Sequence, residues 1–371
     1  MPHLFEPITL RGVTLRNRIV VSPMCEYSSV DGFANDWHVV HLGSRAVGGA
    51  GLVFTEAAAV VPEGRISPQD LGVWSEKHFE TLARIVRFMD GQGAVAGIQL
   101  AHAGRKASTY RSFPGEPQGE VRPENGGWQT VAPSAVQFSP DYPLPRALSV
   151  AEIAAAREAF VTAAVRAEAA GFRVIELHAA HGYLFHEFLS PLSNQRTDSY
   201  GGSFDNRTRF LRETAGAVRA RLSDATALFV RLSATDWIEG GWDADQTVAL
   251  ARALKDLGVD LIDVSSGGNV LKATIAVGPG YQTPFAEKVR RETGIKTSAV
   301  GLITDAAQAD HIVRTGQADL VMLARELLRN PYWPMHAAEA LGHAASWPAQ
   351  YLRAAPKGST PRAPLESSAL D

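Results

Sequence analysis

The sequence contains a single cysteine, Cys25, in 371 residues. A lone cysteine cannot form an internal disulfide bond, and an iron–sulfur cluster typically needs four cysteine ligands, so one chain can hold neither. Residues 1–6 lack the basic start and the apolar run of a signal peptide. We therefore expect a cytoplasmic protein.

Strong charge and long apolar runs are also missing. The formal net charge is -3 and the isoelectric point is about 6.4, so the chain has no overall field that would attract nucleic acid or an anionic membrane. No uninterrupted apolar segment approaches the ~20 residues needed to span a bilayer. Hydrophobic residues still make up 45% of the chain, which is enough for a large core. The composition predicts a globular protein with no nucleic-acid or membrane partner.

Strand-like and helix-like patterns alternate along the chain. The expected strands are 19–24, 52–56, 95–100, 174–178, 228–233, 261–265, 297–300 and 320–323. The expected helices are 37–47, 76–91, 151–170, 207–222, 243–257, 284–293, 305–315 and 331–341. Near-continuous apolar strands indicate a parallel sheet, and eight strand–helix units predict an α/β fold, a closed (β/α)8 TIM barrel. An open doubly wound sheet is the alternative, weakened because no Gly-x-Gly-x-x-Gly turn follows the first strand.

Two segments do not fit this repeat. Residues 109–146 are rich in proline, glycine and charge, so we interpret them as a loop insertion after strand three and a candidate lid. Residues 354–371 are dominated by proline, serine, alanine and charge, and we predict that this tail is disordered. A single barrel domain is therefore expected over residues 1–353.

Residues 176–184, at the end of strand four, contain His178, His181 and Tyr183. The active site of a TIM barrel lies at the carboxyl ends of its strands, so these side chains are the first candidates for chemistry. Two imidazoles can donate hydrogen bonds to one anionic oxygen. A tyrosine, with an ordinary pKa of about 10, stays protonated at neutral pH and can give up a proton.

The same two histidines have other interpretations. They could be structural histidines with satisfied hydrogen bonds. They could also bind a metal together with His186 and Glu187, although they straddle the change from strand to loop instead of sharing one helix face.

More polar and small residues lie at the other strand ends. Those at or just beyond the ends of strands one to three are Pro23, Met24, Cys25, Tyr27, Ala57 and Gln99. A lone cysteine is more often a core residue than a reactive one, but its place at the barrel mouth favours a functional role. Small side chains near Ala57 would let a flat ligand approach the backbone, and the amide of Gln99 suits a cofactor contact.

Arg231 lies inside the apolar strand 228–233. Because an uncompensated buried charge is costly, we expect this guanidinium to be paired. One interpretation is an internal ion pair with Glu176 as the candidate partner, and the other is an anionic ligand in the barrel mouth.

Gly301 follows strand seven, and Ala324 and Arg325 follow strand eight. Phosphate commonly binds a TIM barrel at these two loops through backbone N–H groups, and a nearby arginine adds a charged contact. Together with the histidine group across the mouth, this predicts a planar cofactor that carries a phosphate.

Several longer motifs resemble those of one enzyme family. They are Ser-Pro-Met-Cys at 22–25, His-Ala-Gly-Arg-Lys-Ala at 102–107, residues 176–184, Ser-Tyr-Gly-Gly-Ser at 199–203, Asn-Arg at 206–207, Gly-Leu-Ile-Thr-Asp at 301–305 and Leu-Ala-Arg-Glu at 323–326. From about residue 4 to residue 353, the chain resembles the Old Yellow Enzyme family of FMN-dependent ene-reductases, and within it the bacterial branch that includes xenobiotic reductase A.

The resemblance implies a bound FMN that is reduced by NADPH and reoxidised by an electron-poor alkene. His178 and His181 would bind the carbonyl oxygen of the substrate, and Tyr183 would protonate one alkene carbon. Tyr27 would reach the substrate oxygen, and Cys25 would tune the flavin. The implied contacts to FMN are those of Pro23, Met24, Cys25, Ala57, Gln99 and Arg231, with Gly301, Ala324 and Arg325 at the phosphate.

Members of this branch lend a C-terminal residue to the active site of a neighbouring subunit. Residues 351–353 match that segment, which implies a homodimer or homotetramer in which Arg353 crosses over. The chain departs from the compact members in its longer insertion, 109–130, and in the tail beyond Arg353.

Two other classes of function remain open at this stage. A metal-dependent barrel lyase or hydrolase would use His178 and His181 as ligands. A non-catalytic redox sensor would keep the phosphate site and Cys25 but would not turn over substrate.

Overall fold

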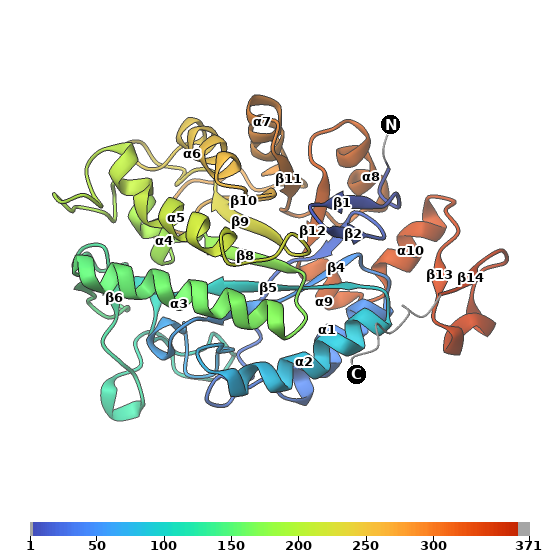
Figure 1. Ribbon diagram of the computed structural model, residues 1–371, viewed down its shortest axis with the longest axis horizontal. Helices are drawn as coiled ribbons and strands as arrows, with labels where there is room; N and C mark the ends of the chain where they lie inside the picture. The colour runs from blue at the N-terminus through green and yellow to red at the C-terminus, as the bar shows by residue number, and fades with distance from the viewer. Residues whose placement is uncertain (1–2, 363–371) are drawn as a thin grey trace.

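The computed structural model describes residues 3–362. Eight parallel strands close into a barrel in the order β10-β11-β12-β3-β4-β5-β8-β9, and helices pack on its outside (Figure 1). The predicted (β/α)8 TIM barrel is confirmed. Across residues 3–362, no helix combines the length and the apolar character needed to cross a bilayer.

The barrel strands match the predicted apolar runs closely. They are β3 (Ile19–Val21), β4 (Leu52–Ala59), β5 (Val95–Ala101), β8 (Val174–Ala179), β9 (Ala227–Ser233), β10 (Leu261–Ser265), β11 (Lys296–Ala299) and β12 (Leu320–Leu323). The first strand ends at Val21, earlier than predicted, because the chain leaves the ladder for the loop that carries Cys25 and Tyr27. The second strand continues past a register shift between Phe54 and Ala57.

One large helix follows each barrel strand. These helices are α1 (Asp36–Val47), α2 (Glu76–Gly91), α3 (Val150–Ala169), α5 (Phe204–Arg219), α6 (Ala244–Asp256), α7 (Thr283–Thr293), α8 (Ala306–Arg314) and α10 (Trp333–Ala340). A capping box between Ser149 and Glu152 begins α3. Two short helices, α4 (Leu184–Leu189) and α9 (Arg325–Arg329), were not expected from the sequence.

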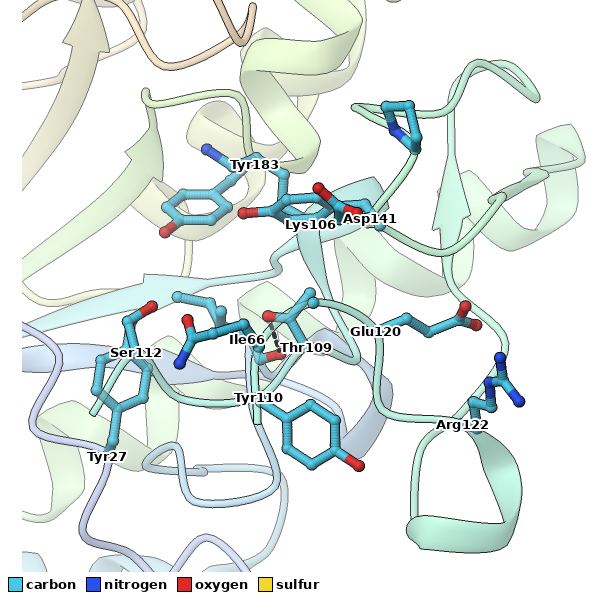
Figure 2. Close-up of a pocket in the computed structure, with 14 residues that line it drawn as sticks. Tyr27, Ile66, Lys106, Thr109, Tyr110, Ser112, Glu120, Arg122, Asp141 and Tyr183 are labelled. Atoms are coloured by element: carbon cyan, nitrogen blue, oxygen red, sulfur yellow. Dashed lines mark hydrogen bonds between the residues drawn. The ribbon is translucent and has the colours of Figure 1, made fainter. Parts of the chain in front are cut away.

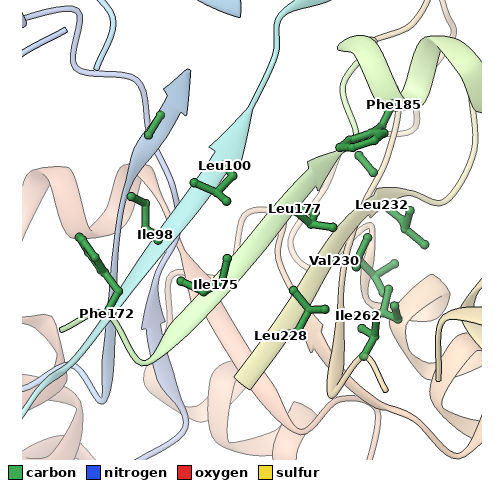
Figure 3. Close-up of a cluster of buried hydrophobic side chains, with 14 of the residues drawn as sticks. Ile98, Leu100, Phe172, Ile175, Leu177, Phe185, Leu228, Val230, Leu232 and Ile262 are labelled. Carbon is green, nitrogen blue, oxygen red and sulfur yellow. The ribbon is translucent and has the colours of Figure 1, made fainter. Parts of the chain in front are cut away.

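Alternate strand residues face the helices or the barrel interior. Outward residues such as Ile98, Ile175, Leu177 and Val230 pack side by side beneath the helices (Figure 3). The inward residues near the start of the strands are apolar, whereas those nearer the carboxyl ends are polar. The carboxyl end of the barrel is therefore lined by polar side chains, which can bind a ligand.

A hairpin that the sequence analysis did not predict packs on the apolar end of the barrel. Strands β1 (Ile8–Leu10) and β2 (Val13–Leu15) pair antiparallel. Their apolar side chains share one buried cluster with inward barrel residues such as Phe54 and Phe229. The hairpin therefore closes the end opposite the predicted site.

The insertion after β5 contains little regular structure. It holds the 3-10 turn η3 (Pro123–Asn125) and the strand pair β6 (Val131–Ala132) and β7 (Arg146–Ala147), while the 3-10 turns η1 (Pro62–Gly64) and η2 (Gly104–Lys106) lie in the preceding loops. In Figure 1 it extends from the side toward which the barrel strands point.

The structure describes residues 354–362, the first part of the tail that the sequence analysis predicts to be disordered. After η4 (Ala349–Ala354), β14 (Thr360–Pro361) pairs with β13 (Ser346–Trp347). Arg362 donates to the carbonyl oxygens of Ala46 at 3.3 Å and Val47 at 3.1 Å, which ties the segment to the end of α1. Residues 363–371 lie outside the described part of the chain.

Candidate active site

A tight turn connects β8 to α4 and brings the three predicted residues together. His181 and Gly182 adopt φ values of 61° and 73°, in the left-handed region. As a result, the ring of His178 lies edge-on to two neighbours, with centroids 5.1 Å from His181 and 5.0 Å from Tyr183. The pattern of two histidines and a tyrosine thus becomes one compact group at the barrel mouth.

Buried side chains hold this turn in place. The backbone N–H of His181 donates to Oγ of Ser233 at 3.0 Å, and that of Gly182 donates to Nδ1 of His186 at 2.9 Å. Nε2 of His186 lies 3.0 Å from Oδ1 of Asp236, and both side chains are fully buried. Because Nδ1 of His186 accepts a hydrogen bond, the N–H of the ring is at Nε2, the atom beside the carboxylate.

Lys106 supports the turn from the loop after β5. Its Nζ donates to the carbonyl oxygens of His181 at 2.9 Å and Gly268 at 3.1 Å, and it lies 5.1 Å from the ring centre of Tyr183. Burial, followed by the charge of Arg105, lowers the pKa of Lys106 to about 8. The sequence analysis did not single out this lysine, since a basic residue in a loop is usually solvated.

The group is held uncharged. Burial, and next the positive charge of Arg231, lowers the pKa of His178 and of His181 well below its ordinary range. Burial also raises the pKa of the Tyr183 phenol well above its ordinary range, although His181 and Tyr183 both keep a partly exposed edge. Each imidazole therefore carries one N–H to donate, and the phenol keeps its proton.

Tyr183 lines a cavity of about 710 Å³. Figure 2 shows Tyr183 and Lys106 on one side of this cavity and Tyr27 and Tyr110 on the other. Most of the remaining wall comes from the insertion, so the insertion borders the space above the predicted catalytic group.

A polar layer fills the barrel interior below the mouth. Nε2 of Gln99 donates to Oε1 of Glu176 at 2.8 Å. The suggested ion pair of Arg231 with Glu176 is wrong. Nε of Arg231 instead lies 3.0 Å from Oδ2 of Asp263. The reason is strand register, which places Arg231 of β9 directly beside Asp263 of β10. Burial and the charge of Asp263 raise the pKa of Glu176.

Cys25 and Tyr27 lie in the loop after β3. Cys25 is half-buried, and burial raises the pKa of its thiol well above its ordinary range, so it stays protonated instead of acting as a thiolate. Tyr27 has a φ of 49°, and burial raises the pKa of its phenol. Pro23 and Met24 lead from β3 into this loop.

Asp70 is a buried carboxyl that the sequence analysis missed. It lines a second, small space of about 10 Å³ together with Ala57 and Tyr183. Burial, and next the charge of Glu56, raises the pKa of Asp70 to about 7. The sequence carries no signal for it, because Asp70 lies in a loop and reaches the site only through folding.

The loops after β11 and β12 offer unpaired backbone donors. Gly301, with a φ of 125°, and Leu302, with a φ of 50°, follow β11, while Ala324 and Arg325 begin α9. Within residues 3–362, the N–H groups of these four residues have no hydrogen-bond acceptor, and the guanidinium of Arg325 is exposed and makes no ion pair. Because β11 and β12 are neighbours, these donors suit one phosphate group.

Comparison with known proteins decides the family. Residues 3–343 match the model of the NADH:flavin oxidoreductase / NADH oxidase family. The chain belongs to this family. It is 51% identical over 352 residues to an NADPH dehydrogenase of Geobacillus sp. (strain WCH70), covering 94% of this chain and 98% of the relative.

Two solved structures are similar to this protein across most of the chain. A morphinone reductase in complex with tetrahydroNAD has a TM-score of 0.77 at 27% identity, covering 93% of this chain and 92% of that one. An old yellow enzyme homologue from Zymomonas mobilis has a TM-score of 0.76 at 26% identity, covering 91% and 93%. The resemblance to the Old Yellow Enzyme family is therefore confirmed, and the protein is an oxidoreductase that uses FMN.

The residues present in this flavin oxidoreductase fit FMN. The unpaired N–H groups after β11 and β12 suit its phosphate, and the polar layer of Gln99 and Arg231 offers donors below the mouth. Gly301 has a φ of 125°, which L side chains rarely adopt, and a Cβ there would also lie 2.9 Å from Nε2 of Gln282, so the position favours glycine. The register shift in β4 brings Ala57, which has a short side chain, beside Gln99.

The side chains of residues 3–362 do not form the metal site that the alternative interpretation requires. No three His, Cys, Asp or Glu side chains gather there in a way that could hold a metal ion. Nε2 of His181 lies instead 2.7 Å from Oγ of Ser265. Membership in a family of enzymes also removes the support for a non-catalytic sensor.

Proposed function

We propose that this protein uses NADPH to reduce the C=C bond of α,β-unsaturated carbonyl compounds and related electron-poor alkenes. The observation that carries the proposal is the compact, uncharged group of His178, His181 and Tyr183 at the barrel mouth, of which Tyr183 lines the cavity above the barrel. The NADPH dehydrogenase relative supports NADPH as the reductant.

The proposed chemistry follows from where charge develops. FMN held in the mouth would, once reduced by NADPH, supply the hydride that reduces the alkene. Negative charge then grows on the carbonyl oxygen, where His178 and His181 each donate one N–H. One preorganised donor to such an oxygen is worth about 3 kcal/mol. Tyr183 keeps its proton until it transfers it from the phenol oxygen to the second alkene carbon.

The remaining predicted residues take supporting roles in this proposal. Tyr27 contacts the substrate oxygen, and the neutral thiol of Cys25 lies beside the flavin and tunes its potential. The proposed FMN contacts are Pro23, Met24, Cys25, Ala57, Gln99 and Arg231, with Gly301, Ala324 and Arg325 at the phosphate.

Phenol binding to the oxidised holoenzyme tests the oxygen site. We expect His178→Ala and His181→Ala each to raise the Kd of phenol by about tenfold or more, because each removes one donor to the phenol oxygen. The change in flavin absorbance during a phenol titration measures this. Unchanged phenol affinity in both variants would exclude the role proposed for the histidines, and a purified protein that takes up no FMN would exclude the function as a whole.

We also propose that the protein is a cytoplasmic homodimer or homotetramer in which Arg353 completes the site of a neighbouring subunit. Arg353 lines an open groove of about 370 Å³ with Tyr332 and Tyr351. Its segment is tied by Arg362 to the end of α1, on the side away from the insertion, so its own mouth is out of reach (Figure 1). Sedimentation velocity checks this: a monomeric holoenzyme that is fully active would contradict it.

A further inference from the structure

The insertion contacts Tyr27 directly through Arg111. One guanidinium nitrogen, Nη1, donates to the carbonyl oxygen of Tyr27 at 3.0 Å. The other two nitrogens bind the carboxylate of Glu116, at 2.7 Å from Nε and 2.6 Å from Nη2. Because the guanidinium is planar and rigid, the pairing with Glu116 also aims its third nitrogen at Tyr27.

Arg111 and Glu116 belong to a short hairpin, residues 110–119. The backbone N–H of Tyr110 donates to the carbonyl oxygen of Gly119 at 2.9 Å, which closes the hairpin. Phe113, near its tip, lies edge-on to the ring of Tyr27 with centroids 6.1 Å apart. Both the backbone and the ring of Tyr27 therefore contact this hairpin.

The segments that flank the hairpin are anchored to the loop after β4. The backbone N–H of Thr109 donates to the carbonyl oxygen of Ile66 at 2.8 Å. Trp128 covers the guanidinium of Arg65 at 4.9 Å, and its indole N–H donates to the carbonyl oxygen of Glu63 at 2.8 Å. Since the chain is held before the hairpin at Thr109 and beyond it at Trp128, the hairpin can hold Tyr27 in a defined position.

Tyr27 needs such support. Its φ of 49° lies in the left-handed region, which costs an L-residue roughly 1–2 kcal/mol. Strained residues of this kind persist where the surroundings hold them, and they gather at ligand sites. Tyr27 also shares the cavity wall with hairpin residues Tyr110, Ser112 and Gly119.

We propose that Arg111 is a positioning residue for Tyr27, so that hairpin 110–119 sets how a substrate rests against the Tyr27 hydroxyl. The inference rests on the proposed function, in which Tyr27 contacts the substrate oxygen. Arg111 itself does not touch the reacting atoms. It acts on affinity, through the peptide of Tyr27, and leaves the transfer of the proton to Tyr183.

A double-mutant cycle on phenol binding tests this inference. The oxidised holoenzyme is titrated with phenol in four forms: unmodified, Arg111→Ala, Tyr27→Phe, and both together. We expect Arg111→Ala to raise the Kd by about fivefold to tenfold, in line with the loss of one charge-assisted hydrogen bond. In the Tyr27→Phe background the same change should have almost no effect, since the hydroxyl that it positions is gone. With 2-cyclohexenone, KM should rise while kcat stays within about twofold.

Arg146→Ala is the matched control. Arg146 ends the same insertion and also binds a glutamate, Glu152, with two nitrogens, at 3.0 and 2.7 Å. This pair has no recorded contact with Tyr27, so the control should leave the Kd of phenol unchanged. Glu116→Gln provides a milder variant if Arg111→Ala does not fold, because it loosens the guanidinium without removing it and should raise the Kd partly.

Hydrogen exchange adds a readout that does not depend on turnover. Backbone amides 26–29 should exchange faster in Arg111→Ala than in Arg146→Ala. An unchanged Kd and unchanged exchange in Arg111→Ala would overturn the inference, as would an equal rise in Kd in the Tyr27→Phe background. Failure of the proposed function looks different, because the unmodified holoenzyme would then neither bind phenol nor reduce the enone.

Discussion

Single side chains in the barrel mouth are held in protonation states that suit the proposed chemistry. Burial keeps the imidazoles of His178 and His181 neutral and keeps the proton on Tyr183. The residue types could be read from the sequence, since all three lie at or just beyond the end of one predicted strand. Their protonation states could not, because those depend on burial and, for the two histidines, on Arg231, which lies on the next strand of the barrel.

Asp70 should make the stability of the protein depend on pH. Burial raises its pKa to about 7, from an ordinary value of 3.8. Between these values the folded chain holds a proton that the unfolded chain has released, so the free energy of unfolding falls as pH rises through this window. We expect Asp70→Asn to remove the contribution of this carboxyl to the fall in the free energy of unfolding. That contribution is about 1.4 kcal/mol for each pH unit between the two pKa values.

Urea unfolding of the two proteins at several pH values between about 4 and 7 measures the Asp70 effect. Comparing the two curves cancels the contribution of other groups that titrate in the same window. Parallel stability curves for the unmodified protein and Asp70→Asn would show that Asp70 titrates alike in the folded and unfolded chains.

At the scale of elements, glycines let the loops after β8 and β10 pack backbone against backbone. A Cβ at Gly182 would lie 2.3 Å from the carbonyl oxygen of Gly268 and 2.8 Å from Cα of Asn269. The turn that carries His181 and Tyr183 is thus held between this contact and the His186–Asp236 pair.

Gly182→Ala should therefore damage both stability and activity. Gly202→Ala is the matched control, because Gly202 has a similar φ, 79° against 73°, but nothing within 4 Å of a new Cβ. Both changes should cost the roughly 1–2 kcal/mol of left-handed strain, and only Gly182→Ala should add a clash and lower kcat/KM. Melting temperatures and steady-state rates measure this. Similar kinetics in the two variants would contradict a tight fit at Gly182.

The eight barrel strands and the large helices could be predicted from apolar periodicity and from caps such as Ser149. The hairpin β1–β2 was missed because each strand has only three residues, although Ile8, Leu10, Val13 and Leu15 alternate with polar positions around an Arg-Gly turn. Helix α4 was missed because its six residues are all buried and show no amphipathic pattern. The Arg231–Asp263 pair needed the register of two strands, which the sequence does not display.

At the scale of the whole molecule, the two ends of the barrel have different roles. The carboxyl end carries the ligand-binding loops, and hairpin β1–β2 closes the other end with apolar side chains. Changes at the hairpin should therefore affect stability and leave the chemistry unchanged.

Leu15→Ala tests this separation. Leu15 is fully buried, so its truncation should lower the free energy of unfolding by about 2–5 kcal/mol. Thr14→Ala, on the exposed face of the same strand, should cost less than about 0.5 kcal/mol. Neither change should alter kcat/KM of the folded holoenzyme. A clear loss of kcat/KM in Leu15→Ala under conditions where it is folded would show that the two ends are coupled.

The two half-reactions of the holoenzyme, followed separately without oxygen, test the proposed catalytic group most directly. Tyr183→Phe removes the proposed proton donor and leaves the flavin site intact. Reduction by NADPH should then stay close to normal, while reoxidation by 2-cyclohexenone should slow by roughly 10²–10⁴. Reoxidation of Tyr183→Phe at nearly the unmodified rate would contradict the role assigned to Tyr183.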